Sequence, residues 1–245
     1  MHNGSFFDLV VDVGNTRLKA ARFVEGRPVA WSIGPHGDLE AVKELLRQER
    51  PRRIVLGSVV ALDPVLLGAL HHWAPVFEVT AATAGALRSA YSTPLTWGVD
   101  RAANALAAHL LFPARPVLAI SAGTCITYDL VDADGLHHGG AISPGLHMRA
   151  KAMHAFTHAL PQVEALEDVA LVGTSTPESL ASGVHHGMRF EVQGYVEALR
   201  QQHPGLAVVV TGGDAPRLVR ALKNGIFAHP LLTLIGLHAL LEHAT

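Results

Sequence analysis

The 245-residue chain has little of what marks disulfide-bonded or zinc-binding proteins. It contains a single cysteine, Cys125. One cysteine excludes an intramolecular disulfide, so we expect a protein of a reducing compartment. The position of Cys125 beside a Ser-Ala-Gly-Thr turn suggests a nucleophile, but a small buried side chain is the more ordinary role of a free cysteine. C-x-x-C and H-E-x-x-H motifs are missing, and a zinc enzyme is therefore not supported.

Excess charge of one sign and long apolar runs are also missing. The chain has 19 Lys and Arg against 21 Asp and Glu. This balance provides no basic stripe, and we expect no binding to nucleic acid. The longest uncharged apolar stretch near the C-terminus, residues 229–241, is shorter than the ~20 residues that span a bilayer. The N-terminus lacks the charged and apolar regions of a signal peptide. The expectation is a protein that does not associate with membranes and has a cytoplasmic location.

Two common nucleotide-binding motifs are absent as well. We find neither G-x-x-x-x-G-K-[ST] nor G-x-G-x-x-G, which disfavours P-loop and dinucleotide-binding folds. The chain contains 16 histidines, among them His154 and His158 at a spacing of four residues. No carboxylate or cysteine accompanies them at ligand spacing, so surface or capping roles are expected rather than a metal site.

What the chain does have is a repeated order of elements. The first half predicts a three-strand meander, followed by alternating helices and strands. The strands of the meander are Leu9–Val13, Arg17–Val24 and Pro28–Ile33, and the elements after it are helix Asp38–Gln48, strand 52–60, helix 62–73, strand 75–80 and helix 100–111. The second half starts with a similar meander and also continues into helices and strands, at 117–121, 125–135, 136–143, helices 145–156 and 177–202, strand 206–214, and helices 215–222 and 231–242. This pattern predicts an α/β protein of two duplicated domains, residues 1–115 and 116–245, with the boundary near Phe112–Pro116.

Each half contains a strand–turn–strand segment with a glycine at the turn. The first is Asp12–Thr16, and the second, Ser121–Thr124, has serine where the first has aspartate. Glycine allows close approach of the backbone to a phosphate, and successive N–H groups form an anion-binding nest. Asp12 could orient Mg²⁺ through water. The alternative is an ordinary hairpin. A further glycine turn at Thr211–Asp214 favours the phosphate interpretation.

An Asp-Arg pair, Asp100 and Arg101, starts a helix directly after Gly98-Val99. The pair has two possible roles. An aspartate in the first turn stabilises the positive end of the helix dipole. It can also act as a general base, with the arginine holding phosphoryl oxygens. Spacing alone favours capping.

Taken in order, these motifs resemble one family. The segments "DVGNTRLK", "GSVV", "GVDR", "AGTCITYD", "GGAISPGL", "GTSTPESLASG", "TGGDA" and "PLLTLIGL" occur in the order seen in type III pantothenate kinases. Each segment is weak alone, but their joint order, from Asp12 to Leu237, is specific. The resemblance implies two ribonuclease-H-like (actin-like ATPase) domains with the nucleotide cleft between them. It also implies ATP-dependent phosphorylation of pantothenate to 4'-phosphopantothenate, the first step of coenzyme A biosynthesis.

The same resemblance implies roles for individual residues. The ATP-binding residues would be Asp12, Val13, Gly14, Asn15, Thr16, Arg17, Leu18, Lys19 and Thr124. The pantothenate-binding residues would be Tyr91, Gly98, Val99, Asp100, Arg101 and Thr176. Asp100 would accept the proton of the primary hydroxyl of pantothenate. Members of the family are homodimers that need Mg²⁺ and use a monovalent cation, K⁺ or NH₄⁺.

One position departs from the family pattern. The family has aspartate, the ligand of the monovalent cation, where this chain has Ser121. The departure puts the cation site in doubt and leaves two alternatives to a pantothenate kinase. One is a non-catalytic homologue with a regulatory or ligand-binding role, and the other is a different small-molecule kinase with the same fold. Because Asp12, Asp100, Arg101 and Thr124 are all present, we favour a catalytic protein.

Overall fold

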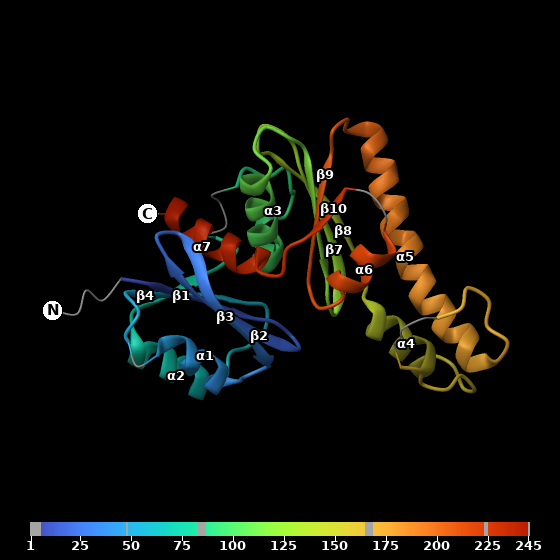
Figure 1. Cartoon of the computed structure of the whole chain (residues 1–245), viewed down its shortest axis with the longest axis horizontal. Helices are drawn as coiled ribbons and strands as arrows, with labels where there is room; N and C mark the ends of the chain where they lie inside the picture. The colour runs from blue at the N-terminus through green and yellow to red at the C-terminus, as the bar shows by residue number, and fades with distance from the viewer. Residues whose placement is uncertain (1–5, 48, 83–86, 165–168, 223–224, 245) are drawn as a thin grey trace. The chain divides into compact units, whose positions relative to one another are not determined.

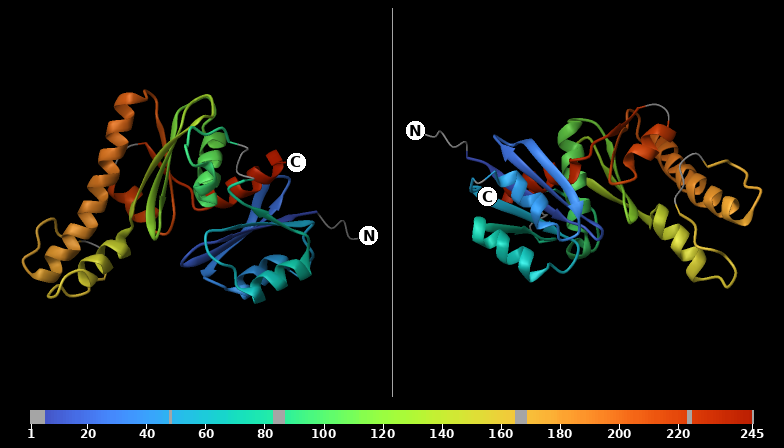
Figure 2. Two further views of the ribbon diagram at one scale, coloured as in Figure 1. Left: turned by 180° about the vertical axis from the view of Figure 1, so that it is seen from behind. Right: turned by 60° about the horizontal axis from the view of Figure 1, so that its bottom comes forward.

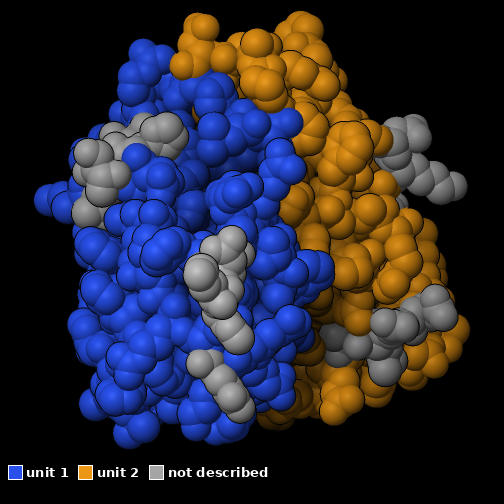
Figure 3. All heavy atoms as spheres, turned by 60° about the vertical axis from the view of Figure 1, so that its left-hand side comes forward, with its two compact units in different colours: residues 1–111, 135–138, 231–245 blue, residues 112–134, 139–230 orange. Residues whose placement is uncertain are grey.

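A computed structural model describes residues 6–47, 49–82, 87–164, 169–222 and 225–244. These residues form two compact units, which are coloured separately in Figure 3. Unit 1 takes the chain up to Leu111, the short segment Gly135–His138 and the C-terminal residues from Leu231. Unit 2 takes residues 112–134 and 139–230. Each unit is built around its own sheet.

The sheet of unit 1 has the strand order β3-β2-β1-β4-β5 (Figure 1). Its strands are β1 (Asp8–Val13), β2 (Arg17–Val24), β3 (Arg27–Pro35), β4 (Arg53–Ser58) and β5 (Val76–Val79). β1, β2 and β3 are antiparallel neighbours, whereas β4 and β5 continue the sheet in parallel. In the register, Asp12 faces Lys19 on β2 and Gly57 on β4.

Helices cover both faces of this sheet (Figure 1). They are α1 (Leu39–Leu46), α2 (Pro64–Trp73), α3 (Val99–Leu111) and α7 (Leu232–Ala244), with a short 3₁₀ turn, η2, at Pro94–Thr96. Asp38 caps α1, where its Oδ1 accepts from the backbone N–H of Ala41 at 3.1 Å. Since side chains alternate along a strand, β1 sends Leu9 and its odd-numbered neighbours into the core with α1 and α2. Asp8 and Asp12 therefore point to the other face.

Unit 2 repeats this arrangement. Its sheet has the order β10-β9-β6-β7-β8, and its strands are β6 (Val117–Ala122), β7 (Cys125–Val131), β8 (His137–Pro144), β9 (Ala207–Thr211) and β10 (Ile226–Ala228). Read from β8, this order is the order of unit 1, again with an antiparallel hairpin (β6 with β7) followed by parallel strands (β6, β9 and β10). The predicted duplication of an α/β domain is therefore confirmed.

Three helices belong to unit 2: α4 (Leu146–Ala155), α5 (Thr176–Gln202) and α6 (Ala215–Ala221). The long helix α5 runs beside the sheet in both views of Figure 2. It packs a buried stripe that includes Val184, Met188, Val192 and Val196 into the core of this unit. Of the described helices, none combines the length and the apolar character needed to cross a membrane.

The units divide the chain differently from the expected boundary between residues 115 and 116. The chain does leave unit 1 after Leu111, close to that point, but α7 and Gly135–His138 return to unit 1. Packing against α3 explains the position of α7. A Cβ on Gly236 would lie 1.9 Å from the carbonyl oxygen of Ala103, so only glycine allows this close approach. Thr233 also donates to Asn104 on α3 at 2.9 Å. These partners are distant in sequence, so helical periodicity could not identify them.

Candidate functional site

The first glycine turn is a tight hairpin between β1 and β2. The N–H of Gly14 donates to the carbonyl oxygen of Arg17 at 3.0 Å, which leaves Asn15 and Thr16 exposed at the tip. The backbone N–H of His36 donates to the carbonyl oxygen of Thr16 at 3.2 Å and so supports the turn. This geometry is compatible with both interpretations of the segment, an ordinary hairpin and a phosphate-binding turn, because a phosphate-binding turn would use the backbone of the same hairpin.

Asp12 lies at the carboxyl end of β1 and is 8% exposed. Burial raises the pKa of Asp12 to about 6, Lys19 opposes this shift, and the charge of Asp100 adds to it. The Nζ of Lys19 lies 3.7 Å from the carboxylate of Asp12. The end of β1 therefore holds a carboxylate that is costly to ionise unless a further positive charge is nearby.

The first turn of α3 presents the second carboxylate. The helix begins at Val99, with Asp100 in its first turn. A Cβ on Gly98 would lie 2.8 Å from Oδ1 of Asp100, so glycine leaves room for this carboxylate. The charge of Asp100 contributes to the raised pKa of Asp12, so these two sequence-distant residues interact electrostatically within unit 1.

Beside Asp100, the side chain of Arg101 is buried, with 5% of the residue exposed. Its Nη1 lies 3.5 Å from the hydroxyl of Tyr91, and its guanidinium carbon lies 5.6 Å from the centroid of the Tyr91 ring. The structure thus brings together Tyr91 and Gly98–Arg101, which the sequence analysis had grouped as pantothenate-binding residues. A cavity of about 650 Å³ is lined by Trp97, Gly98 and Val99, together with apolar and polar residues of β4, α2 and β5, among them Ser58 and Glu78.

Trp97 and His137 are neighbours of this group that the sequence analysis did not select. The two rings are stacked with centroids 4.1 Å apart. The sequence offers little signal for His137, which is one of two adjacent histidines in a chain with 16. Its position depends on a bridge between Ser89 and His137, which no local pattern predicts.

In unit 2, three glycine turns meet at the end of β6. The N–H of Gly123 donates to the carbonyl oxygen of Cys125 at 2.9 Å, and that of Gly145 donates to the carbonyl oxygen of Thr124 at 3.0 Å. A Cβ on Gly145 would lie 2.1 Å from the carbonyl oxygen of Gly123, and one on Gly212 would lie 2.2 Å from that of Ala122. Gly212 also has a positive φ of +97°. The turns around Thr124 and Gly212 are therefore packed backbone against backbone, which requires glycine.

Ser121 lies in a row of hydroxyl groups across this sheet. Its register partners are Thr127 on β7 and Thr211 on β9. The Oγ1 atoms of both threonines are buried and have no hydrogen-bond partner among the described residues. Asp129 is buried on β7 opposite Ala119, two residues farther from the turn than Thr127. The row offers neutral oxygen atoms in place of a carboxylate.

Thr176 is the exposed first residue of α5, after the N-cap Ser175. Thr176, Thr124 and Ser121 belong to unit 2, whereas Asp12–Lys19, Tyr91 and Gly98–Arg101 belong to unit 1. Cys125, which was expected to be a small buried residue, is partly exposed. It begins β7, directly after the turn.

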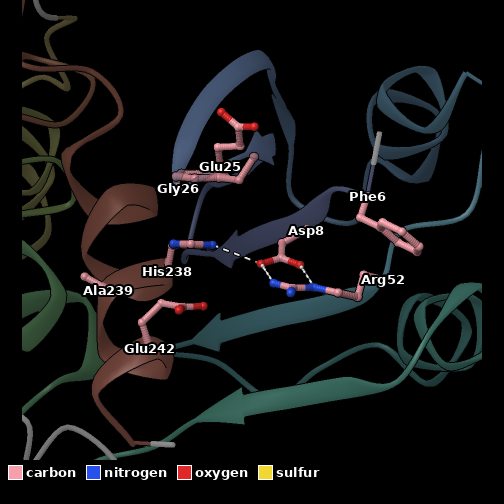
Figure 4. Close-up of a pocket in the computed structure, with 9 residues that line it drawn as sticks. Phe6, Asp8, Glu25, Gly26, Arg52, His238, Ala239 and Glu242 are labelled. Atoms are coloured by element: carbon pink, nitrogen blue, oxygen red, sulfur yellow. Dashed lines mark hydrogen bonds and ion pairs between the residues drawn. The ribbon is translucent and has the colours of Figure 1, made fainter. Parts of the chain in front are cut away.

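One group of metal-binding residue types lies elsewhere in unit 1. Asp8, His238 and Glu242 place their ligand atoms within 4.8 Å of one another, beside a cavity of about 600 Å³ (Figure 4). The carboxylate of Asp8, however, already accepts from Arg52 at 2.8 and 2.9 Å, from Arg53 at 2.9 and 3.1 Å, and from Nε2 of His238 at 3.0 Å. Two guanidinium groups on one carboxylate disfavour a cation. We interpret the group as an ion-pair network that fixes α7 to β1.

Solved structures share this fold at low sequence identity. One titled as a conserved putative Baf family transcriptional activator from Campylobacter jejuni aligns with a TM-score of 0.61 and 17% identity, covering 96% of this chain and 97% of that chain. An activator of the 2-hydroxyisocaproyl-CoA dehydratase from Clostridium difficile, solved with bound ADPNP, aligns with a TM-score of 0.55 and 14% identity, covering 97% and 96%. Together with the two sheets of equal strand order, these likenesses define an actin-like ATPase fold of two duplicated ribonuclease-H-like domains.

Sequence comparison is more specific. The family model of type III pantothenate kinase matches residues 8–198. A type III pantothenate kinase of Phocaeicola vulgatus is 39% identical over 237 residues, which cover 96% of this chain and 98% of that protein. One of Porphyromonas gingivalis is 37% identical over 242 residues, covering 97% and 98%. The chain belongs to the type III pantothenate kinase family.

Proposed function

We propose that the protein transfers the γ-phosphoryl group of ATP to the primary hydroxyl of pantothenate. The product is 4'-phosphopantothenate, and the reaction is the first step of coenzyme A biosynthesis. Membership of the type III pantothenate kinase family supports this proposal. The structural observation that carries it is the placement of two carboxylates in unit 1: Asp12 lies at the buried end of β1, 3.7 Å from Nζ of Lys19, and Asp100 stands in the first turn of α3 directly after Gly98. A carboxylate beside a lysine suits a site that holds a metal-bound phosphate, and a second carboxylate suits the acceptance of an alcohol proton.

In this proposal Asp100 is the general base. Phosphoryl transfer depends mainly on positioning and charge stabilisation, and a positioned base contributes typically 10²–10⁴-fold. Gly98 leaves space for the carboxylate of Asp100, and the first turn of α3 fixes its direction. Tyr91, Gly98, Val99 and Arg101 would bind pantothenate together with Asp100, and the family resemblance assigns Thr176 to the same substrate.

We assign the ATP phosphates to the hairpin Asp12–Lys19 and to Thr124. The exposed turn residues Asn15 and Thr16 suit an anion, as does the glycine-rich packing around Thr124. Asp12 is the residue proposed to hold Mg²⁺ through ordered water, and the ion would neutralise phosphate charge. The position of Asp12 at the carboxyl end of β1, directly before the hairpin turn at Gly14, supports this assignment.

The monovalent cation, K⁺ or NH₄⁺, is expected from the family, and Ser121 marks its position. The neutral hydroxyl groups of Ser121, Thr127 and Thr211 would attract such an ion less than a carboxylate. We therefore propose kinase activity with weak or no activation by a monovalent cation.

We also propose a homodimer in the cytoplasm. Unit 2 exposes large apolar side chains on and near α5, among them Phe190 at 49% and Tyr195 at 40% exposure. Leu171 and Val172, before α5, are 59% and 78% exposed. Burial of some of these side chains against a second copy would remove apolar area from water. The single free cysteine suits a reducing compartment.

A coupled assay of ADP formation, with and without pantothenate, tests the proposed activity. We expect ADP formation that depends on pantothenate and saturates with it. A chain that binds ATP but forms no ADP in the presence of pantothenate would instead favour a non-catalytic homologue. Dependence on another alcohol in place of pantothenate would favour a different small-molecule kinase. Sedimentation of the same preparation measures whether the chain is a dimer.

A further inference from the structure

A layered group of side chains lies beside the first turn of α3 in unit 1. Trp97 directly precedes Gly98, and its ring stacks on the ring of His137 with an interplanar angle of 11°. The ring of Tyr91 lies 6.1 Å from that of His137 and 6.3 Å from that of Trp97. His137 is therefore in contact with both aromatic residues next to the proposed pantothenate-binding segment.

The backbone holds His137 in this place. A parallel bridge joins Ser89 and His137. The N–H of Ala90 donates to the carbonyl oxygen of His137 at 2.9 Å, and the N–H of His137 donates to that of Arg88 at 2.9 Å. His137 is fully buried, with 0% of its surface exposed. Its imidazole is consequently a fixed surface against which neighbouring side chains pack.

Hydrogen bonds of the Ser89 side chain link His137 to Tyr91. The Oγ of Ser89 lies 2.8 Å from Nδ1 of His137. The same Oγ accepts from the backbone N–H of Tyr91 at 3.1 Å. Tyr91 is in turn the residue whose hydroxyl lies 3.5 Å from Arg101. His137 thus contacts Trp97 directly and is linked to Tyr91 through the hydrogen bonds of Ser89.

Trp97 also forms part of the wall of the cavity of about 650 Å³ that Gly98 and Val99 line. Because Trp97 is 4% exposed and stacked on His137, a change at His137 would alter the wall of this cavity. The reacting groups assigned above, Asp12 and Asp100, are outside this stack.

We infer that His137 is a positioning residue for pantothenate: it fixes Trp97, in the wall of the cavity that Gly98 and Val99 line, and Tyr91, beside Arg101, and takes no part in proton transfer. The inference rests on the proposed function, because that function assigns Tyr91 and Gly98–Arg101 to the binding of pantothenate. It predicts that loss of the imidazole affects substrate affinity far more than turnover.

The test compares His137→Ala and His137→Phe with the wild-type protein. His137→Ala removes both the stacking partner of Trp97 and the Ser89 hydrogen bond, whereas His137→Phe keeps a ring for stacking. We expect His137→Ala to raise the KM for pantothenate about tenfold, from the loss of a stacked pair and a hydrogen bond. His137→Phe should raise it about threefold. The kcat and the KM for ATP should stay within about twofold of wild type.

His138→Ala is the matched control, since His138 is the next residue on β8 and is exposed. It should leave all three constants unchanged. Tryptophan fluorescence supplies a second readout, because Trp97 is one of 3 tryptophans and the one stacked on His137. His137→Ala should change the emission of the wild-type background and not that of a Trp97→Phe background.

An unchanged KM for pantothenate in His137→Ala would overturn the inference. A fall in kcat as large as the rise in KM in the folded His137→Phe variant would also overturn it, since that result assigns His137 to the chemical step. If His137→Ala does not fold, the KM of His137→Phe decides. A wild-type protein that does not phosphorylate pantothenate would instead contradict the proposed function, and the fluorescence experiment would still report on the packing of Trp97 against His137.

Discussion

In unit 1 the charge of Asp100, in the first turn of α3, acts on Asp12 at the end of β1. Burial is the largest cause of the raised pKa of Asp12, and the charge of Asp100 adds to it. The two carboxylates are far apart in sequence, and each has an ordinary structural explanation by itself. Taken singly, Asp12 is the end of a strand and Asp100 a residue that caps a helix. The electrostatic interaction between them is what favours a functional role for the pair.

The first prediction concerns Asp100→Asn. The substitution keeps the shape of the side chain and removes the proposed base, so kcat should fall about 10²–10⁴-fold. ATP binding and the free energy of unfolding should change little. Glu40→Gln is the control, because Glu40 also lies in the first turn of a helix, α1, but is exposed. A kcat close to that of wild type in Asp100→Asn would show that Asp100 only caps α3.

The same variant tests the electrostatic link directly. Since the charge of Asp100 raises the pKa of Asp12, Asp100→Asn should lower the pKa of Asp12 from about 6. The carboxyl carbon of Asp12 can be titrated by NMR in both proteins. Burial would keep the pKa above 3.8, the ordinary value for aspartate. An identical titration of Asp12 in the two proteins would contradict the proximity of the two carboxylates.

A third prediction follows from the network around Asp8. Burial alone would raise the pKa of Asp8, but hydrogen bonds from Arg52, Arg53 and His238 outweigh it and lower the pKa to about 2. A lowered pKa stabilises the folded state above the unfolded value of 3.8, and this stabilisation is lost as the pH falls towards 2.

Asp8→Asn should therefore lower the free energy of unfolding at pH 7 by on the order of 2 kcal/mol. The difference between variant and wild type should shrink as the pH falls from about 4 to about 2. Urea unfolding of both proteins across this pH range measures the difference in the free energy of unfolding. The exposed Glu44→Gln is the control and should change stability little at any pH. A difference that persists undiminished at the lowest pH would mean that Asp8 acts through packing and not through its charge.

The sequence predicts the duplicated sheets well because their signals are local. Glycine turns such as Gly14 and the consecutive apolar residues of β1 lie within a few positions of one another, and they predict the hairpins of the sheet. The N-cap Asp38 is local in the same sense. By contrast, the bond from His238 to Asp8 joins residues 230 positions apart.

For the candidate site, grouping Tyr91 with Gly98–Arg101 depended on family resemblance, and the structure brings these residues together. Neither helical nor strand periodicity indicates that His137 lies beside Trp97, since a bridge to Ser89 fixes that contact. Periodicity does not indicate the placement of α7 in unit 1 either. An apolar helix has the same pattern whichever neighbour it packs against, and the close approach at Gly236 appears only in three dimensions.

A fourth prediction tests this packing of α7 on α3. Gly236→Ala would place a Cβ 1.9 Å from the carbonyl oxygen of Ala103, so the helices must separate. We expect a loss of about 1–3 kcal/mol in the free energy of unfolding, typical of overpacked cores. Gly183→Ala on α5 is the control, as a Cβ there meets no atom within 4 Å. That change should stabilise the protein by about 0.5–1 kcal/mol, because alanine is the better helix former. Destabilisation of the two variants to the same degree would contradict the packing argument.

The last prediction concerns Ser121, where the family has the aspartate that binds a monovalent cation. Ser121 stands between Thr127 and Thr211, whose hydroxyl groups are buried and have no partner among the described residues. Three neutral hydroxyl groups offer oxygen ligands but no negative charge, and hard cations depend on both. Asp129 does not replace the missing carboxylate at the turn, since two residues along a strand correspond to about 7 Å.

We therefore expect the wild-type kinase to show weak or no activation by K⁺, whereas Ser121→Asp should gain saturable activation. The experiment titrates K⁺ against Na⁺ at constant ionic strength and measures kcat and the KM for ATP. Ser92→Asp adds the same charge at an exposed position of unit 1 and should leave the response to K⁺ unchanged. This pair of results would show that activation by K⁺ depends on the position of the carboxylate and not on the added charge alone. Strong, saturable K⁺ activation of the wild-type protein that Ser121→Asp does not alter would show that the cation in this protein does not depend on a carboxylate at position 121.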